Sequence, residues 1–132
     1  MTYAKFEFLE EDLLKVSLQG IEPTGPQFED YLAEFQFVLA SSEKLAIVLD
    51  ASKAQFIPSK LRVRQGQWFK QFDPELRSKV EQMNLVATNP MVKFLLEGIF
   101  LVHRPSVNLK IYTSVGDAED QARDALRGAV AA

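Results

Sequence analysis

The sequence predicts an α/β protein, in which a mixed, mainly parallel sheet of about five strands is covered by about four helices. Near the start of the chain, apolar and polar residues alternate with a period of two, which is typical of half-buried strands. Later segments carry apolar residues at spacings of three and four, as amphipathic helices do. The two kinds of segment then alternate in the order ββαβαβαβα, which favours parallel strands joined by right-handed crossovers.

Length and composition narrow the class of protein. The chain has 132 residues, 47% of them hydrophobic, and we expect a single domain over residues 1–132. A net charge of -3 argues against a nucleic-acid partner. Without cysteine and with one histidine, no metal or other cofactor is expected. No signal peptide is visible at the N-terminus, so we expect a cytoplasmic protein.

Two strands and a helix are predicted in the first third of the chain. The strands lie around residues 6–8 and 14–18 and are joined by an acidic turn. Glycine and proline are dense over residues 20–26, and Pro26 suits the first turn of a helix. That helix is predicted from one apolar stripe: Phe28, Tyr31, Leu32, Phe35, Val38 and Leu39.

The middle of the chain predicts a central strand and a second helix. Residues 45–49 are continuously apolar, as in a strand buried on both faces. The helical stripe beyond the next loop has Ser59 as its expected N-cap. Asp73 followed by Pro74 predicts a break, with a short helical continuation that reaches residues 79–82. The stripe itself consists of Leu61, Arg64 or Gln65, Trp68 and Phe72.

The last third predicts two strands and two helices. A short strand is expected over residues 83–88, and Asn89 is expected to cap the helix that follows. Residues 91–102 are apolar on nearly every side, so we expect this helix to be covered on more than one side, with His103 at its C-terminus. A strand around residues 109–111 precedes a terminal helix over residues 116–130. The inner side of that helix is expected to carry Ala118, Ala122, Ala125 and Leu126.

The end of the central strand carries a recognisable pattern. Val48-Leu49-Asp50 is followed by Ser52, by the pair Phe56-Ile57 and by Ser59 at the mouth of a helix. With the order of elements, this pattern resembles the STAS domain of bacterial anti-sigma factor antagonists, and the later chain is similar to the SpoIIAA-like branch of that family. The resemblance implies a non-enzymatic regulatory module, in which Ser59 matches the serine that a partner kinase phosphorylates. Pro58, Lys60 and Leu61 differ from the family's Asp-Ser-Ser/Thr-Gly motif, so the switch motif is degenerate.

We therefore expect a protein partner and no catalytic residues. A phosphate on Ser59 would meet the positive N-terminus of its helix and nearby basic side chains, whereas a simple capping role is the competing interpretation. The candidate partner-binding residues are Asp50, Ser52, Phe56, Ile57, Lys60, Arg62 and Arg64.

The apolar helix supports an alternative function. Its surplus apolar surface could be plain core, could form a homodimer interface, or could wall a pocket for a lipid or another apolar ligand. The residues predicted for such a pocket or interface are Phe94, Leu95, Ile99 and Phe100.

Overall fold

A computed structural model describes residues 2–131 of the chain, and the side chains of residues 2–128. Five strands and four helices follow one another in the predicted order, which confirms the fold class. The strands are β1 (Ala4–Glu10), β2 (Leu13–Leu18), β3 (Leu45–Asp50), β4 (Val80–Val86) and β5 (Leu109–Tyr112). The helices are α1 (Gly25–Ser41), α2 (Ser59–Lys79), α3 (Pro90–Val102) and α4 (Val115–Ala131).

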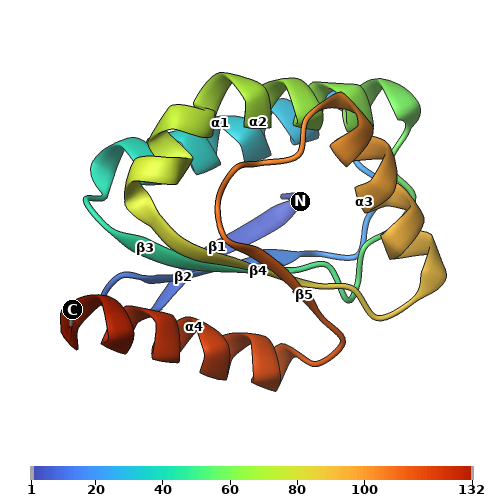
Figure 1. Cartoon of the computed structure of the whole chain (residues 1–132). Helices are drawn as coiled ribbons and strands as arrows, with labels where there is room; N and C mark the ends of the chain where they lie inside the picture. The colour runs from blue at the N-terminus through green and yellow to red at the C-terminus, as the bar shows by residue number, and fades with distance from the viewer. Residues whose placement is uncertain (1, 132) are drawn as a thin grey trace.

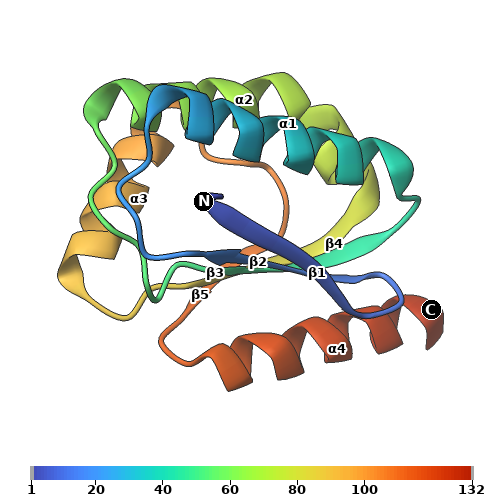
Figure 2. The same ribbon diagram turned by 180° about the vertical axis from the view of Figure 1, so that it is seen from behind.

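The strands lie side by side in sequence order. β1 and β2 form an antiparallel pair, and each later strand adds in parallel to the one before it. Since every right-handed crossover then advances in the same direction, α1, α2 and α3 all cover one face of the sheet. Only α4, which follows the last strand, covers the opposite face (Figures 1 and 2).

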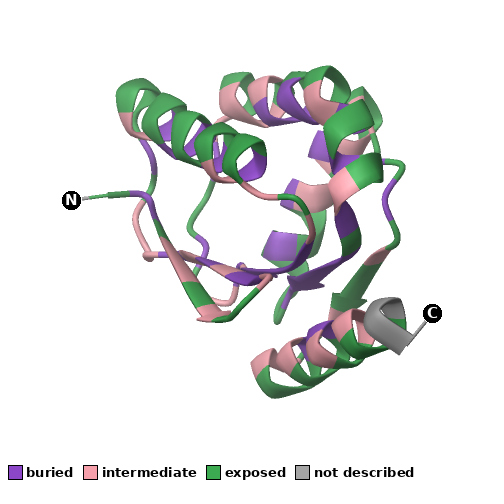
Figure 3. Ribbon diagram, turned by 90° about the vertical axis from the view of Figure 1, so that its left-hand side faces the viewer, coloured by how far each residue is buried: buried purple, intermediate pink, exposed green. Residues whose placement is uncertain are grey.

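β3 is the most deeply buried strand. Every residue from Leu45 to Leu49 is buried, which confirms the prediction of a strand covered on both faces. Alternate residues face two different cores. Buried residues of the sheet lie between the helices on its two faces (Figure 3). Ile47 packs toward α1 to α3, whereas Val48 packs toward Ala118 and Ala122 of α4, as the alanine pattern predicted.

Two of the predicted helix ends are confirmed. Asn89 is the N-cap of α3, and its side-chain oxygen accepts the backbone N–H of Val92 at 3.0 Å. His103 is the C-cap of the same helix. At α1 the cap is Thr24, whose hydroxyl accepts the N–H of Gln27 while the Gln27 side chain accepts the N–H of Thr24.

The predicted break at Asp73 and Pro74 is wrong. α2 continues through Pro74 to Lys79, and β4 begins at once with Val80, where a helical continuation was expected. The Asp73 carboxylate is engaged with Ser106, so it does not cap a new helix. Leu76, one turn beyond Phe72, is fully buried, and this packing holds the helix together across the proline.

The expectation that α3 would be covered on more than one side is confirmed, because the helix packs against α2 at Gly66 as well as over the ends of the strands. Val92, Leu95 and Ile99 are buried on the inner side of the helix, and Leu96 and Phe100 are partly buried against the core beside them. The opposite face is open to solvent, with Phe94 54% exposed and Leu101 89% exposed. α3 therefore has a large apolar outer surface that no other element within residues 2–131 covers.

Candidate functional site

The loop between β3 and α2 folds back against the core at the carboxyl ends of the parallel strands. The Asp50 carboxylate accepts the backbone N–H of Ser52 at 3.0 Å, and the N–H of Ala54 donates to the carbonyl of Ala51 at 3.0 Å. Asp50 and Ser52, both predicted partner contacts, are half-buried and shape this turn. Ile57, a third predicted contact, is buried with its side chain facing inward.

Ser59 lies at the start of α2 and is exposed, but it is not the N-cap. Pro58 takes that position, because its carbonyl already accepts the N–H groups of Leu61 and Arg62 at 2.9 and 3.0 Å. The helix thus begins one residue earlier than predicted, and no side chain caps it. The capping interpretation of Ser59 is therefore wrong, and its hydroxyl is accessible at the positive end of a helix.

The basic residues near Ser59 have different partners. Arg64 pairs with Glu29 of α1, its Nε lying 2.7 Å from Oε1. Arg62 donates from its guanidinium to the carbonyl of Ile57. Lys60 is exposed and forms no ion pair with the residues that the structure describes. The three basic residues predicted to bind a partner therefore do not form one cluster. Arg62 and Arg64 have partners within the protein, and Lys60 is the accessible cation.

Arg62 lies between two exposed aromatic rings. Its guanidinium carbon is 5.3 Å from the centre of the Phe56 ring and 5.4 Å from the centre of the Phe94 ring. A Cβ added at Gly98 would lie 3.2 Å from Arg62 Nε, so the arginine packs closely on α3. We call Phe56, Lys60, Arg62 and Phe94 the Arg62 surface. It joins the loop, the start of α2 and the outer face of α3.

α2 and α3 cross in very close contact at Gly66. A Cβ at this position would lie 2.4 Å from the Cβ of Val102 and 2.9 Å from the carbonyl oxygen of Ile99. Only glycine fits such an approach without a shift of one helix. The crossing sets the position of α3 over the ends of the strands.

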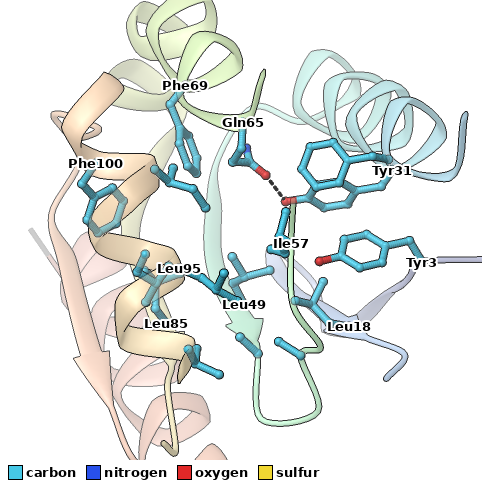
Figure 4. Close-up of a pocket in the computed structure, with 16 residues that line it drawn as sticks. Tyr3, Leu18, Tyr31, Leu49, Ile57, Gln65, Phe69, Leu85, Leu95 and Phe100 are labelled. Atoms are coloured by element: carbon cyan, nitrogen blue, oxygen red, sulfur yellow. Dashed lines mark hydrogen bonds between the residues drawn. The ribbon is translucent and has the colours of Figure 1, made fainter. Parts of the chain in front are cut away.

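A cavity lies beneath α3. Its volume is about 40 Å³, and none of its sixteen lining residues is charged. Three of the four residues predicted for a pocket or interface, Leu95, Ile99 and Phe100, line it, whereas the fourth, Phe94, is exposed and does not. Leu18, Leu49 and Leu85 contribute the carboxyl ends of three neighbouring strands, and Ala51, Ala54 and Ile57 contribute the loop (Figure 4).

One end of the cavity is polar, a feature that the sequence analysis missed. The Tyr31 hydroxyl donates to Gln65 Oε1 at 2.7 Å, and the Tyr3 hydroxyl lies on the same side (Figure 4). Burial raises the pKa of Tyr3, and burial followed by the neighbouring Tyr3 raises the pKa of Tyr31, so both hydroxyls stay protonated. The available signal was a glutamine within an otherwise apolar helical stripe.

A second polar cluster was also missed. The Asp73 carboxylate accepts the Ser106 N–H at 2.8 Å and the Ser106 hydroxyl at 2.7 Å, and His103 Nε2 lies 3.4 Å away. Burial opposes the charged form, but the bonds from Ser106 and the proximity of His103 outweigh it and lower the pKa of Asp73. Because the Ser106 hydroxyl donates to Asp73, this arrangement does not activate a nucleophile. It fastens the chain after α3 to α2.

Among the described residues, no group of three or more histidine, cysteine, aspartate or glutamate side chains could hold a metal ion. Within the same part of the chain, no helix has the length and apolar character needed to cross a membrane. No known family model matches the sequence, and no curated protein matches it significantly.

Proposed function

We propose that this domain is a non-enzymatic, STAS-like regulatory module that binds a protein partner through the Arg62 surface. The observation that carries this proposal is the pair of exposed aromatic rings, Phe56 and Phe94, held on either side of Arg62. Aromatic and arginine side chains dominate the binding energy of protein interfaces. Met91 and Leu101 extend the apolar surface along the same face of α3.

Charge indicates the kind of partner. Lys60, at the start of α2, and Lys93, next to Phe94 in the sequence, are exposed, and neither forms an ion pair with the residues described. A partner segment that combines apolar and acidic side chains would complement both features. A second copy of this chain is the competing occupant, and light scattering of the purified protein distinguishes the two.

The STAS-like assignment is supported by the order of the elements and by the end of β3. The sheet runs in sequence order, and Asp50 closes the central strand before the loop and the helix that carry the site. Ser59, the residue that matches the phosphorylated serine, is exposed at the first position of α2.

Partner binding is tested by substitution on the Arg62 surface. Phe94→Ala should weaken capture of the partner from a host lysate by about tenfold or more, because an exposed aromatic anchor is lost. Phe37→Ala is the matched control, since Phe37 is 70% exposed but lies on α1. Quantitative mass spectrometry of the captured proteins measures both. A protein captured equally by wild type and Phe94→Ala would contradict the proposal.

Regulation at Ser59 is a separate part of the proposal. A phosphate there would lie at the helix N-terminus beside Lys60, where both the helix dipole and the lysine favour negative charge. Intact-mass analysis of protein from its native host, prepared with phosphatase inhibitors, should show a phosphorylated form that Ser59→Ala abolishes. Ser59→Asp should change partner capture, and unchanged capture would argue against the switch.

The cavity favours a second candidate function, the carrying or sensing of an apolar small ligand. It lies beneath α3 at the carboxyl ends of the parallel strands, which is the usual place for ligands in sheets of this kind. Native mass spectrometry of freshly purified protein tests it. A co-purified apolar molecule favours this function, and an empty protein that captures a specific partner favours the first.

A further inference from the structure

The polar end of the cavity contains two hydrogen-bond donors without acceptors. Tyr3 is 2% exposed and Gln65 is 4% exposed. Neither the Tyr3 hydroxyl nor Gln65 Nε2 has a hydrogen-bond partner among the described residues. A buried donor left in this state costs about 1–3 kcal/mol, so both groups are suited to an acceptor that enters the cavity.

The hydrogen bond between Tyr31 and Gln65 determines which atom of the Gln65 amide has no partner. Tyr31 donates to the amide oxygen of Gln65 at 2.7 Å and thereby leaves the amide nitrogen as the unpaired end. Figure 4 shows Tyr3 beside Tyr31, with its hydroxyl directed toward the cavity. Both free groups donate, and they lie at one end of a lining that is otherwise apolar.

The same lining excludes charge. None of the sixteen lining residues is a lysine, arginine, histidine, aspartate or glutamate. A bound ion would lose its hydration without a compensating charge, which costs far more than a neutral polar group held by hydrogen bonds.

We propose that this cavity binds a small neutral molecule with an apolar body and a carbonyl oxygen, and that Tyr3 and Gln65 donate to that oxygen. This inference rests on the second function proposed above, the binding of an apolar ligand. The volume of about 40 Å³ accommodates only a few heavy atoms, so a longer molecule requires an outward shift of α3. The close crossing with α2 involves Ile99 and Val102, so such a shift would involve the start of α3, where Val92 and Leu95 are the buried side chains.

The test compares two probes of nearly the same shape, 2-hexanone and pentanoate. The ketone should produce saturable NMR shifts at Leu95, at Ile99 and at the side-chain amide of Gln65. In pentanoate a charged oxygen replaces the methyl group on the ketone's carbonyl carbon. Pentanoate should therefore bind at least about tenfold more weakly at neutral pH. Pentanoate binding as tight as the ketone would overturn the assignment of a neutral ligand.

Two variants test the donors. Tyr3→Phe and Gln65→Leu should each weaken 2-hexanone binding by about threefold to tenfold, because one hydrogen bond is lost. Each should also reduce the downfield shift of the bound ketone's labelled carbonyl carbon. Tyr112→Phe is the control, since Tyr112 lies on β5 and does not line the cavity. Tyr3→Phe removes only an unpartnered hydroxyl, so it should fold like the wild type.

The outcomes separate this inference from the function on which it rests. Saturable binding that is unaffected by Tyr3→Phe and Gln65→Leu would overturn the role of the donors and leave the apolar-ligand function standing. A wild-type protein that shows no saturable binding of 2-hexanone would overturn both.

Discussion

At the scale of single residues, the starts of α2 and α3 differ although each lies next to a proline. Asn89 caps α3 through its side chain, whereas Ser59 is one position past the N-cap of α2 and bonds to no helix N–H. The difference arises because Pro58 is the N-cap of α2. Its carbonyl accepts the first N–H groups of the helix, and it has no side-chain acceptor to cap them. A hydroxyl released from a structural role is available for modification.

This difference predicts unequal stability changes. Ser59→Ala should change the free energy of unfolding by less than about 0.5 kcal/mol, as exposed surface substitutions do. Asn89→Ala should lower it by about 1 kcal/mol, because the Val92 N–H loses its acceptor. Urea denaturation measures both variants. A cost at Ser59 as large as that at Asn89 would contradict the observed cap.

Asp73 predicts a dependence on pH. Its pKa is lowered in the folded state, so its ionised form stabilises the fold fully above the unfolded pKa of about 3.9, and this stabilisation is lost as the pH falls through the lower, folded pKa. Asp73→Asn should lower the free energy of unfolding by about 1–3 kcal/mol at neutral pH. The difference from wild type should shrink at lower pH.

Urea denaturation at a series of pH values measures this difference. Asp124→Asn is the matched control, because Asp124 forms an exposed pair with Arg127 at 2.9 Å and such pairs contribute little. A gap between wild type and Asp73→Asn that stays constant through the acid range would contradict the role assigned to the ionised carboxylate.

At the scale of elements, the crossing of α2 and α3 depends on one glycine. In isolation Gly66 weakens α2 by about 1 kcal/mol relative to alanine. It is nevertheless the residue that lets Val102 and the Ile99 carbonyl approach α2. The close crossing therefore outweighs helix propensity at this position.

Gly66→Ala tests this balance. The added Cβ meets Val102 and the backbone of α3, so the variant should be less stable by about 1–3 kcal/mol despite its better helix propensity. Gly128→Ala, in α4, is the control, because a Cβ there has no neighbour within 4 Å, and it should be neutral or slightly stabilising. Thermal unfolding measures both. A stabilised Gly66→Ala variant would show that α3 moves away at little cost.

At the scale of the whole molecule, stability is distributed unevenly over the fold. β3 is covered on both faces, whereas α3 leaves its outer face exposed and covers the cavity with its inner side. The same helix carries Phe94 on its outside and Leu95 on its inside. A ligand that shifts α3 would therefore move part of the Arg62 surface as well.

Hydrogen exchange should reveal this distribution. Amides of residues 45–49 should exchange only through global unfolding, because their strand is hydrogen-bonded on both sides within the core. Amides of α3 should exchange through local opening, at a free energy clearly below the global value. Equal protection of the two segments would contradict a separately mobile α3.

Local patterns in the sequence determined the order of the elements, the two-sided burial of β3 and the cap at Asn89. Each depends on residues close together in the chain, where periodicity and capping chemistry act directly. The candidate loop was located in the same way, since Asp50 ends a strand whose apolar run is visible in the sequence.

Only the tertiary structure decided the rest. In the folded protein α2 continues through Pro74, and Arg62 lies between Phe56 and Phe94. Ile57 faces inward, and Tyr3 and Gln65 lie at one end of a cavity. These features depend on how segments far apart in the chain pack against one another. How two segments pack depends on the shapes of both segments together. A periodic pattern within one segment contains no information about the segment against which it packs.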